Sequence, residues 1–543
     1  MRFPVFVRLA LGILLGPLLS AEDSQRRIDK IFADYNKTDS PGCALGVIRD
    51  GSFIYRRTYG MASLELGLPL SSASIFYLGS VSKQFTAASV VLAAEQGFLS
   101  LDDDVRKYIP ELPDYGHTIT LREMLHHTSG IRDFLTLLAL AGRDGSDIHT
   151  DAEIIDLIAR QKELNNVPGA KYIYSNSNYF LLGVVVKRAT GKPLAEFAAE
   201  NIFRPLGMAH TRYYDDHTVV VPGRVAAYDK GIDGKFLVEW STGFDIVGAG
   251  GLMSSIDDLL LWDKNFYANR LGNGTLLREL QTRGVLNDGK QISYALGLEL
   301  GEYRGSPVVD HNGALFGYRT EILRFPEQRL TVLCLCNVSS ANPTNLTRKV
   351  ADFYLQGNLQ SEFHADNGLN VSHLPAPSLF AGTYLDPVNH FVYSFTASGN
   401  TLKAWGADLR RIGPNQFRDL GTGTITFTSS DGLMHATLAM DSEEFFSGDK
   451  IEVPRLSAAD LSDYAGQYRS TEVDATYSLS FMDGSLVLKF NWDPAIKLEP
   501  IAPGQFQSPD LGTIVFQRDA NGRVNGFGIY TVNARGVSFV RSN

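Results

Sequence analysis

Cysteine is scarce in this chain of 543 residues, which contains only Cys43, Cys334 and Cys336. Three thiols do not make the dense framework of bridges found in small secreted domains. Cys334 and Cys336 are two residues apart in the apolar run LTVLCLCN, which is typical of a strand. Both should face the same side of that strand and lie in the core. A metal site is the weaker interpretation, because no histidine or further cysteine is nearby, and we expect no metal.

An excess of basic residues is also lacking. The chain has 60 acidic residues against 50 lysines and arginines, which gives a net charge of −10 at pH 7. Without a basic tract, nucleic acid and anionic lipid are disfavoured as main partners. The hydrophobic content of 44% is ordinary for packed globular protein. A homodimer is compatible with the sequence, which does not fix the oligomeric state.

Long apolar runs are missing except at the N-terminus. Arg2 and Arg8 precede an apolar run over residues 9–19, and small residues follow it before the polar Glu22. This pattern is typical of a secretory signal peptide, and the run is too short to cross a bilayer comfortably. A buried N-terminal helix is the alternative. We therefore expect a signal peptide over residues 1–21, a periplasmic or secreted protein, and no membrane span.

Several common catalytic motifs are absent. The sequence contains no G-x-S-x-G, no H-E-x-x-H, no Walker A loop and no C-x-x-C. These absences exclude the usual serine esterases, zinc metalloproteases, nucleotide hydrolases and thioredoxin-like proteins. His126 and His127 are adjacent but lack metal-ligand spacing, so we interpret them as structural. No cofactor is expected.

Apolar periodicity predicts an α+β domain over residues 22–358. Residues 43–49 and 53–59 are expected to be strands joined by a turn at Asp50-Gly51. Helices are expected at residues 24–36, 80–96, 151–161, 178–189, 256–266 and 343–356. A capping box is expected at residues 120–123. Further strands are expected at residues 308–311, 317–325 and 330–337. We therefore expect a sheet that joins strands from both ends of the domain. A helical subdomain should be inserted between these two groups of strands.

The remainder of the chain contains an internal repeat. The segment Phe380-Ala-Gly-Thr-Tyr384 recurs as Tyr464-Ala-Gly-Gln-Tyr468. Matching segments later in the two units are separated by a longer distance along the chain, so the second unit contains an insertion around Trp492. Each unit alternates apolar and polar residues in short runs, which predicts two small antiparallel barrels. Their expected bounds are 379–453 and 454–543, after a linker over 359–378. Neither unit contains a plausible catalytic set.

The element Ser80-Val-Ser-Lys83 opens an apolar, buried helix. Free N–H groups and the helix dipole there favour negative charge that develops near Ser80. Lys83 shares its face one turn later, and burial should lower the pKa of its amine so that it accepts the serine proton. The alternative is Ser80 as a helix cap and Lys83 as a solvated residue. The same spacing recurs at Ser447 and Lys450, in a polar turn where we interpret it as accidental.

Two further elements follow in the chain. Tyr174-Ser-Asn176 precedes an apolar helix that Asn176 or Ser177 should cap, which places Tyr174 on a loop near a cleft. The alternative for Tyr174 is a packed aromatic residue. His311 is expected to end a strand, with a turn through Gly313 that allows a ligand to approach the backbone closely.

With these three elements in order, the chain resembles the serine β-lactamase and penicillin-binding protein superfamily, over about residues 24–357. The stretches PGCALGVIRDG, ITLREMLHHTSGI, PGAKYIYSNSNYFLLG and GAGGLMSSIDDLLLW are also similar. The resemblance implies a β-lactamase-like catalytic domain, an antiparallel sheet flanked by helices plus a helical subdomain. It also implies that Ser80 forms an acyl-enzyme, that Lys83 and Tyr174 share the proton transfers, and that Asn176 holds the substrate amide. The N–H groups of Ser80 and Ala314 would form the oxyanion hole.

The third element departs from the family's common Lys-Thr-Gly. A histidine at position 311 is only partly charged near neutral pH by its reference pKa of about 6.5, which disfavours substrates with a carboxylate. With two lipocalin-like barrels after the catalytic domain, the chain resembles the D-aminopeptidase branch, in which a loop from one barrel shapes the active site.

This resemblance predicts a serine hydrolase of small amide, peptide or ester substrates that contain D-amino acids, with His311 and Gly313 in the site. An esterase and a weak β-lactamase or DD-carboxypeptidase are alternatives within the enzyme class. From another class, a penicillin-type sensor without turnover and a cell-wall-binding protein stay open. A sensor would be acylated once and stay acylated, which separates it from an enzyme.

Overall fold

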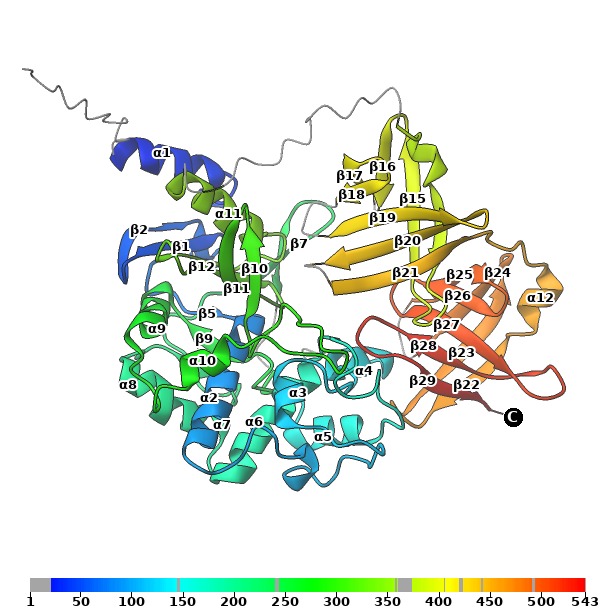
Figure 1. Ribbon diagram of the computed structural model, residues 1–543, viewed down its shortest axis with the longest axis horizontal. Coiled ribbons are helices and arrows are strands. Elements are labelled where there is room, and N and C mark those ends of the chain that lie inside the picture. The colour runs from blue at the N-terminus through cyan, green and yellow to red at the C-terminus, as the bar shows by residue number, and fades with distance from the viewer. Residues whose placement is uncertain are drawn as a thin grey trace, which may run out of the picture.

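The computed structural model describes residues 21–143, 147–239, 244–356, 359, 374–404, 406–418, 423–440, 443–490 and 494–542 (Figure 1). Residues 1–20 of the expected signal peptide, most of the expected linker and the insertion around Trp492 lie outside these ranges. Among the described residues, no helix has both the length and the apolar character needed to cross a membrane.

Six antiparallel strands form the main sheet, in the order β10, β11, β12, β13, β1, β2. The bounds are β1 Cys43–Arg49, β2 Ser52–Tyr59, β10 Glu299–Tyr303, β11 Ser306–Leu315, β12 Tyr318–Phe325 and β13 Leu330–Cys336. Asp50 and Gly51 turn between β1 and β2 with φ of 52° and 73°, the left-handed values that a two-residue hairpin needs. The prediction that the sheet joins both ends of the domain is confirmed, as the blue and green strands of Figure 1 show.

Helices cover both faces of this sheet. On one face, α1 (Ala21–Ile31) contacts α11 (Pro343–Tyr354), which packs on β12 and β13. On the other face, α9 (Ile256–Ala268) packs on β1 and β13. Because β1 and β13 are covered on both sides, their residues are buried almost without alternation.

The disulfide between Cys43 and Cys336 corrects the expectation that Cys336 is only a core thiol. The two residues are directly opposite each other on β1 and β13 and are bonded through sulfur, although 293 positions separate them in the sequence. Cys334 is a free, buried cysteine, and its Sγ lies 3.6 Å from Sγ of Cys336. The two cysteines therefore share one face of the strand, as predicted.

Helices between the two groups of strands form the inserted subdomain. They are η1 Gly79–Ser82, α2 Lys83–Glu95, η2 Val105–Lys107, α3 Leu121–Leu125, α4 Phe134–Leu140, α5 Asp151–Ala159, α6 Asn176–Thr190, α7 Leu194–Ala198, the π-helical η3 Ala199–Phe203, α8 Arg204–Leu206 and α10 Leu276–Leu280. Short strands connect them: β3 Met61–Ser63, β4 Leu68–Pro69, β5 Phe76–Tyr77, β6 Arg212–Tyr213, β7 Ala227–Lys230, β8 Phe236–Glu239 and β9 Leu252–Ser254. The capping box predicted at Thr120 and Glu123 is present at α3.

The repeat forms two closed eight-stranded antiparallel barrels, which confirms the predicted fold class. The first follows η5 Pro377–Leu379 and comprises β14 Gly382–Leu385, β15 Val392–Ser398, β16 Thr401–Ala404, β17 Ala407–Gly413, β18 Gln416–Arg418, β19 Thr424–Ser430, β20 Leu433–Met440 and β21 Glu443–Ile451. The second follows α12 Ala458–Ser462 and comprises β22 Gly466–Ser470, β23 Ala475–Met482, β24 Ser485–Lys489, β25 Ile496–Ala502, β26 Gln505–Ser508, β27 Gly512–Arg518, β28 Val524–Tyr530 and β29 Val537–Arg541. In each barrel the repeated tyrosine, Tyr384 or Tyr468, donates to the carbonyl oxygen four residues earlier.

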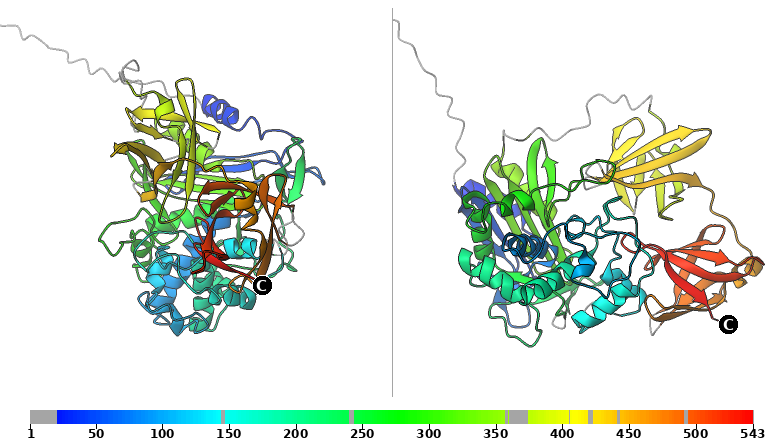
Figure 2. Two further views of the ribbon diagram at one scale, coloured as in Figure 1. Left: turned by 90° about the vertical axis from the view of Figure 1, so that its right-hand side faces the viewer. Right: turned by 60° about the horizontal axis from the view of Figure 1, so that its bottom comes forward.

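The second barrel lies against the helical subdomain, next to α4 and α5 (Figure 2). The hydroxyl group of Tyr477 donates to the carbonyl oxygen of Leu140 over 2.8 Å, and the amide of Arg535 donates to the side chain of Asn165. The first barrel in turn contacts the second, where the rings of His390 and Tyr530 are 4.4 Å apart.

Candidate active site

Ser80 lies in η1, the 3₁₀ turn that leads into α2, and this turn packs on β11. Gly79, just before it, has a φ of 55°, which a residue with a side chain rarely adopts. A Cβ on Gly79 would lie 2.8 Å from the amide nitrogen of Ala314. The backbone around Ser80 therefore approaches the backbone of β11 closely, and the structure brings Ser80 and Ala314 together.

Lys83 is completely buried at the start of α2. Its Nζ lies 3.0 Å from Oγ of Ser80, 2.9 Å from Oδ1 of Asn176 and 2.7 Å from the carbonyl oxygen of Ala249. Burial lowers the pKa of Lys83 to about 7, although the negative charge of Asp133 partly opposes this shift. A neutral amine can donate its two N–H groups to Asn176 and Ala249 and point its lone pair at Ser80.

Tyr174 approaches Ser80 from the loop before α6. Its hydroxyl group donates to Oγ of Ser80 over 2.8 Å, and its ring centroid lies 4.8 Å from Nζ of Lys83. Burial raises the pKa of Tyr174 far above its usual value, and the hydrogen bond to Ser80 only partly offsets this. The phenol therefore stays protonated and acts as a donor in this arrangement.

Asn176 is the first residue of α6 and does not cap it, contrary to expectation. The N-cap residue is Ser175, which makes no side-chain capping bond. Instead the carboxylate of Asp133 accepts from the backbone N–H of Asn176 over 2.6 Å and from its Nδ2 over 2.8 Å. A carboxylate from another segment thus takes the place of the local cap, because it satisfies the free N–H at the helix start.

Asp133 is a residue of the site that sequence reasoning missed. It is buried, and besides holding Asn176 it caps α4 by accepting from the N–H of Thr136 over 3.0 Å. An aspartate directly before the apolar run FLTLLAL carries a capping signal. Its second contact, across 43 residues to Asn176, leaves no local signal.

The prediction that the strand ends at His311 is wrong, because β11 continues through Leu315. Gly313 still pairs with Thr320 on β12. A Cβ at Gly313 would lie 2.1 Å from the carbonyl oxygen of Leu78 and 2.3 Å from Oγ1 of Thr320. Glycine is therefore required here for close backbone packing within a strand and makes no turn.

His311 is buried and has both ring nitrogens engaged. Its Nδ1 lies 2.6 Å from the carbonyl oxygen of Asn312, and its Nε2 lies 3.0 Å from the hydroxyl group of Tyr294. Burial lowers the pKa of His311 to about 4, and the charge of Lys83 acts in the same direction. The imidazole is thus neutral near pH 7, where its reference pKa alone predicted partial charge.

His127 lies inside this cluster, beneath Tyr174, where the two rings are 4.3 Å apart. Its Nδ1 accepts from the backbone N–H of Ser175 over 3.2 Å. Burial keeps the pKa of His127 well below its usual value. His127 thus supports the loop that carries Tyr174, in agreement with its structural interpretation.

The second Ser-x-x-Lys lies on the strand β21 of the first barrel, so the prediction that it lies in a polar turn is wrong. Oγ of Ser447 lies 3.1 Å from Nε2 of His435, and Nζ of Lys450 donates to the carbonyl oxygen of Leu379. No bond between Ser447 and Lys450 is present among the described contacts. The recurrence is therefore accidental, as predicted.

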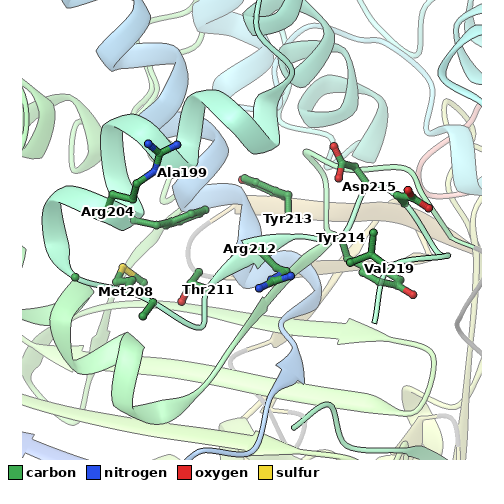
Figure 3. A pocket seen from close by; sticks show the side chains of 13 residues that line it. Ala199, Arg204, Met208, Thr211, Arg212, Tyr213, Tyr214, Asp215 and Val219 are labelled. Carbon is green, nitrogen blue, oxygen red and sulfur yellow. The ribbon is translucent and has the colours of Figure 1, made fainter. Parts of the chain in front are cut away.

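A hollow of about 550 Å³ lies elsewhere, where Arg212 and Tyr213 of β6 form part of its wall (Figure 3). It is lined by residues such as Phe203, Met208 and Tyr213, and none of the residues around Ser80 lines it. Tyr213 connects its wall to α2 through a hydrogen bond of 2.7 Å to Thr86.

One group of three potential metal ligands occurs within the described ranges. It consists of Cys43, Cys334 and Cys336, and the disulfide already joins two of them.

The family model described as Beta-lactamase matches residues 28–355. The chain is 26% identical over 529 residues to a D-aminopeptidase of Brucella anthropi, covering 92% of this chain and 95% of that protein.

The fold also occurs in solved structures. An octameric penicillin-binding protein homologue from Pyrococcus abyssi has a TM-score of 0.56 and 19% identity, covering 87% of this chain and 99% of that one. A D-amino acid amidase from Ochrobactrum anthropi SV3, in complex with D-phenylalanine, has a TM-score of 0.52 and 22% identity, covering 62% of this chain and 99% of that one.

Proposed function

This chain belongs to the beta-lactamase family and is a serine-type hydrolase, and we propose that it hydrolyses small amides, peptides or esters of D-amino acids through an acyl-enzyme on Ser80. One observation carries the proposal: Oγ of Ser80 lies 3.0 Å from a buried lysine amine and 2.8 Å from a tyrosine hydroxyl. A serine hydroxyl becomes a useful nucleophile only when a base within hydrogen-bond reach takes its proton.

In the acylation step, Oγ of Ser80 attacks the substrate carbonyl carbon while its proton moves to the neutral amine of Lys83. In this proposal the N–H groups of Ser80 and Ala314 stabilise the negative charge that develops on the carbonyl oxygen, and the close approach of η1 to β11 supports this role. Tyr174 passes a proton to the leaving nitrogen and regains one from Lys83. Water then attacks the ester, and the same groups transfer its proton in reverse order.

Asn176 has a double role in this proposal. Its Nδ2 is held by Asp133, and its Oδ1 accepts from Lys83. An amide oxygen has two lone pairs, so Oδ1 can also accept from a substrate N–H. The side chain thereby orients the lysine amine and the substrate amide relative to one another.

His311 supports the part of this proposal that concerns charge, namely that the preferred substrates have no carboxylate to be recognised at this position. A neutral imidazole, with Nδ1 and Nε2 both engaged, supplies no fixed positive charge for a carboxylate. The D-aminopeptidase from Brucella anthropi, similar over 92% of this chain, supports the same substrate class.

Turnover of three chromogenic substrates tests the proposal. The protein lacking residues 1–21 is incubated with D-alanine p-nitroanilide, p-nitrophenyl acetate and a chromogenic cephalosporin, while turnover and intact mass are followed. We expect turnover of the anilide, its loss in Ser80→Ala, and normal turnover in Ser447→Ala, which removes the serine of the accidental motif. Full activity of Ser80→Ala would exclude the nucleophile, and turnover of the ester alone would exclude the D-amino acid preference. A stable adduct without turnover would indicate a sensor.

We also propose that the protein is exported to the periplasm or beyond. The Cys43–Cys336 disulfide supports this, because structural disulfides persist mainly in oxidising compartments. Cell fractionation with N-terminal sequencing tests it. A cytoplasmic protein that retains Arg2 and Arg8 would exclude export.

A further inference from the structure

A buried ion pair joins the second barrel to the helical subdomain. An Nη atom of Arg132 lies 2.7 Å from Oε1 of Glu472, and the side chains are only 1% and 2% exposed. Glu472 stands between β22 and β23, whereas Arg132 stands two residues before α4. The pair therefore crosses a domain interface at a position that water does not reach.

Glu472 is surrounded by donors from both sides of the interface. Its carboxylate accepts from the N–H of Lys162 over 3.0 Å and from the N–H of Ser538 over 2.7 Å. Its carbonyl oxygen accepts from Nε2 of Gln161, and Oε1 of Gln161 accepts from the same Nη atom of Arg132. Glu472 is thus fixed in one orientation by contacts on both domains.

Arg132 is less well satisfied than its partner. Its Nε has no hydrogen-bond partner among the residues that the structure describes. Burying two charges is costly even when they are paired, and apolar residues often replace such pairs without loss of stability. Stability alone therefore does not explain why this pair is buried here.

The residue after Arg132 is Asp133, which the barrel also holds. The N–H of Asp133 donates to the carbonyl oxygen of Asn533 over 3.0 Å, in the turn between β28 and β29. The carbonyl oxygen of Arg132 accepts from Oγ of Ser177 over 2.6 Å. Two consecutive residues are thereby clamped between the barrel and the start of α6.

Two residues, Asp133 and Asn176, link the second barrel to the lysine amine. Asp133 binds the backbone and side chain of Asn176, and Asn176 binds Nζ of Lys83. We propose that Glu472 is a positioning residue: through Arg132 and Asp133, the second barrel sets the position of Asn176 and hence of Lys83 beside Ser80. This inference rests on the proposed function, and it concerns how the site is held rather than which substrate it takes.

The groups that face Lys83 provide a readout for this positioning. Asp133 raises the pKa of Lys83, whereas burial of His127 and His311 lowers their pKa values and keeps both rings neutral near pH 7. The phenol of Tyr174 is also uncharged there, because burial raises its pKa. If Asp133 moves away, the pKa of Lys83 falls, and the acidic limb of the pH–rate profile moves to lower pH.

The proposal is tested by the substitution Glu472→Gln in the protein that lacks residues 1–21 and keeps both barrels. Tyr477→Phe is the matched control. The hydroxyl group of Tyr477 donates to the carbonyl oxygen of Leu140 across the same interface, and no hydrogen bond from Tyr477 to Arg132 or Asp133 is found among the described residues. We expect Glu472→Gln to lower kcat by about 2- to 30-fold, the size typical of residues that act through a contact network. KM should change little, and the acidic limb should move to lower pH. Tyr477→Phe should leave both kcat and the limb unchanged.

The results separate this inference from the proposed function. The rate of Ser80 acylation by p-nitrophenyl acetate is measured in parallel, because it does not depend on a D-amino acid preference. If the unsubstituted protein does not turn over the anilide, the proposed substrate class is wrong. The positioning of Lys83 can still be tested then, because the rate of acylation by the ester depends on it. Wild-type kcat and an unmoved limb in Glu472→Gln would overturn the inference. An equal loss in Tyr477→Phe would also overturn it, because a merely structural interface would respond in that way.

If Glu472→Gln does not fold, Arg132→Lys serves as the second variant. It keeps the positive charge but cannot reach Glu472 and Gln161 with one planar group, as arginine does. The same fall in kcat and the same shift of the limb are expected. Unchanged values of both in this variant would overturn the inference.

Discussion

The hydroxyl group of Tyr294 donates a hydrogen bond to Nε2 of His311, over 3.0 Å. The direction follows from the other side of the ring, where Nδ1 lies 2.6 Å from the carbonyl oxygen of Asn312. A carbonyl oxygen can only accept, so Nδ1 carries the proton, and Nε2 of the neutral ring is left as an acceptor. Tyr294 was not among the residues that the sequence singled out, yet it fixes the state of His311.

His311 should therefore not titrate in the physiological range. Because burial lowers the pKa of His311 to about 4, its ring stays neutral from pH 5 to pH 8. An NMR pH titration checks this, with His311→Asn used to assign the resonance. A C2 proton signal that shifts with a midpoint near 6.5 would contradict the prediction.

Activity should depend on the protonation of Lys83. Burial lowers the pKa of Lys83 to about 7, and the neutral amine is the active form. kcat/KM should thus rise with pH through about 7, stay high above it, and be lost as the pH falls below it. The profile is measured with D-alanine p-nitroanilide. Lys83→Arg, which stays charged, should be inactive throughout, and a pH-independent profile from pH 5 to pH 9 would contradict the assignment.

Gly313→Ala should damage the site without unfolding the protein. The new Cβ would lie 2.1 Å from the carbonyl oxygen of Leu78, so the backbone of β11 must move away from η1. The N–H groups of Ser80 and Ala314 would then separate, and we expect kcat to fall by about 100-fold, as for loss of an oxyanion donor. Steady-state turnover measures kcat, and circular dichroism shows whether the variant is folded.

Gly301→Ala is the control for this substitution, on the neighbouring strand β10. There the added Cβ would lie 3.7 Å from Cγ2 of Val308, an ordinary contact. Its kcat should equal that of the unsubstituted protein. An equal loss of kcat in both variants would show that any added methyl group in this sheet is harmful.

The disulfide should contribute substantially to stability. Replacing Cys43 and Cys336 by alanine should lower the free energy of unfolding by about 2–5 kcal/mol, the usual range for a native disulfide. Urea denaturation measures the change, and Cys334→Ala, which leaves the disulfide intact, is the comparison. The unreduced, denatured protein should react with a thiol reagent at Cys334 alone. Labelling of Cys43 or Cys336 without reduction would contradict the pairing.

The sequence by itself determined the features that depend on neighbouring residues. The turn at Asp50-Gly51, the capping box at Thr120 and the two barrels follow from local patterns and from self-similarity of the chain. Residue spacing, helix polarity and the family resemblance together singled out Ser80, Lys83 and Tyr174, and hydrogen bonds join these three residues in the structure.

Only the tertiary structure decided which distant groups meet. The pairing of Cys43 with Cys336, the clamp on Asp133 and the ion pair of Glu472 all join segments far apart in the chain. The neutral state of His311 also depends on burial by the surrounding fold. Periodicity carries information about the face of one element, whereas these contacts depend on how elements pack, and packing leaves little trace in a single sequence.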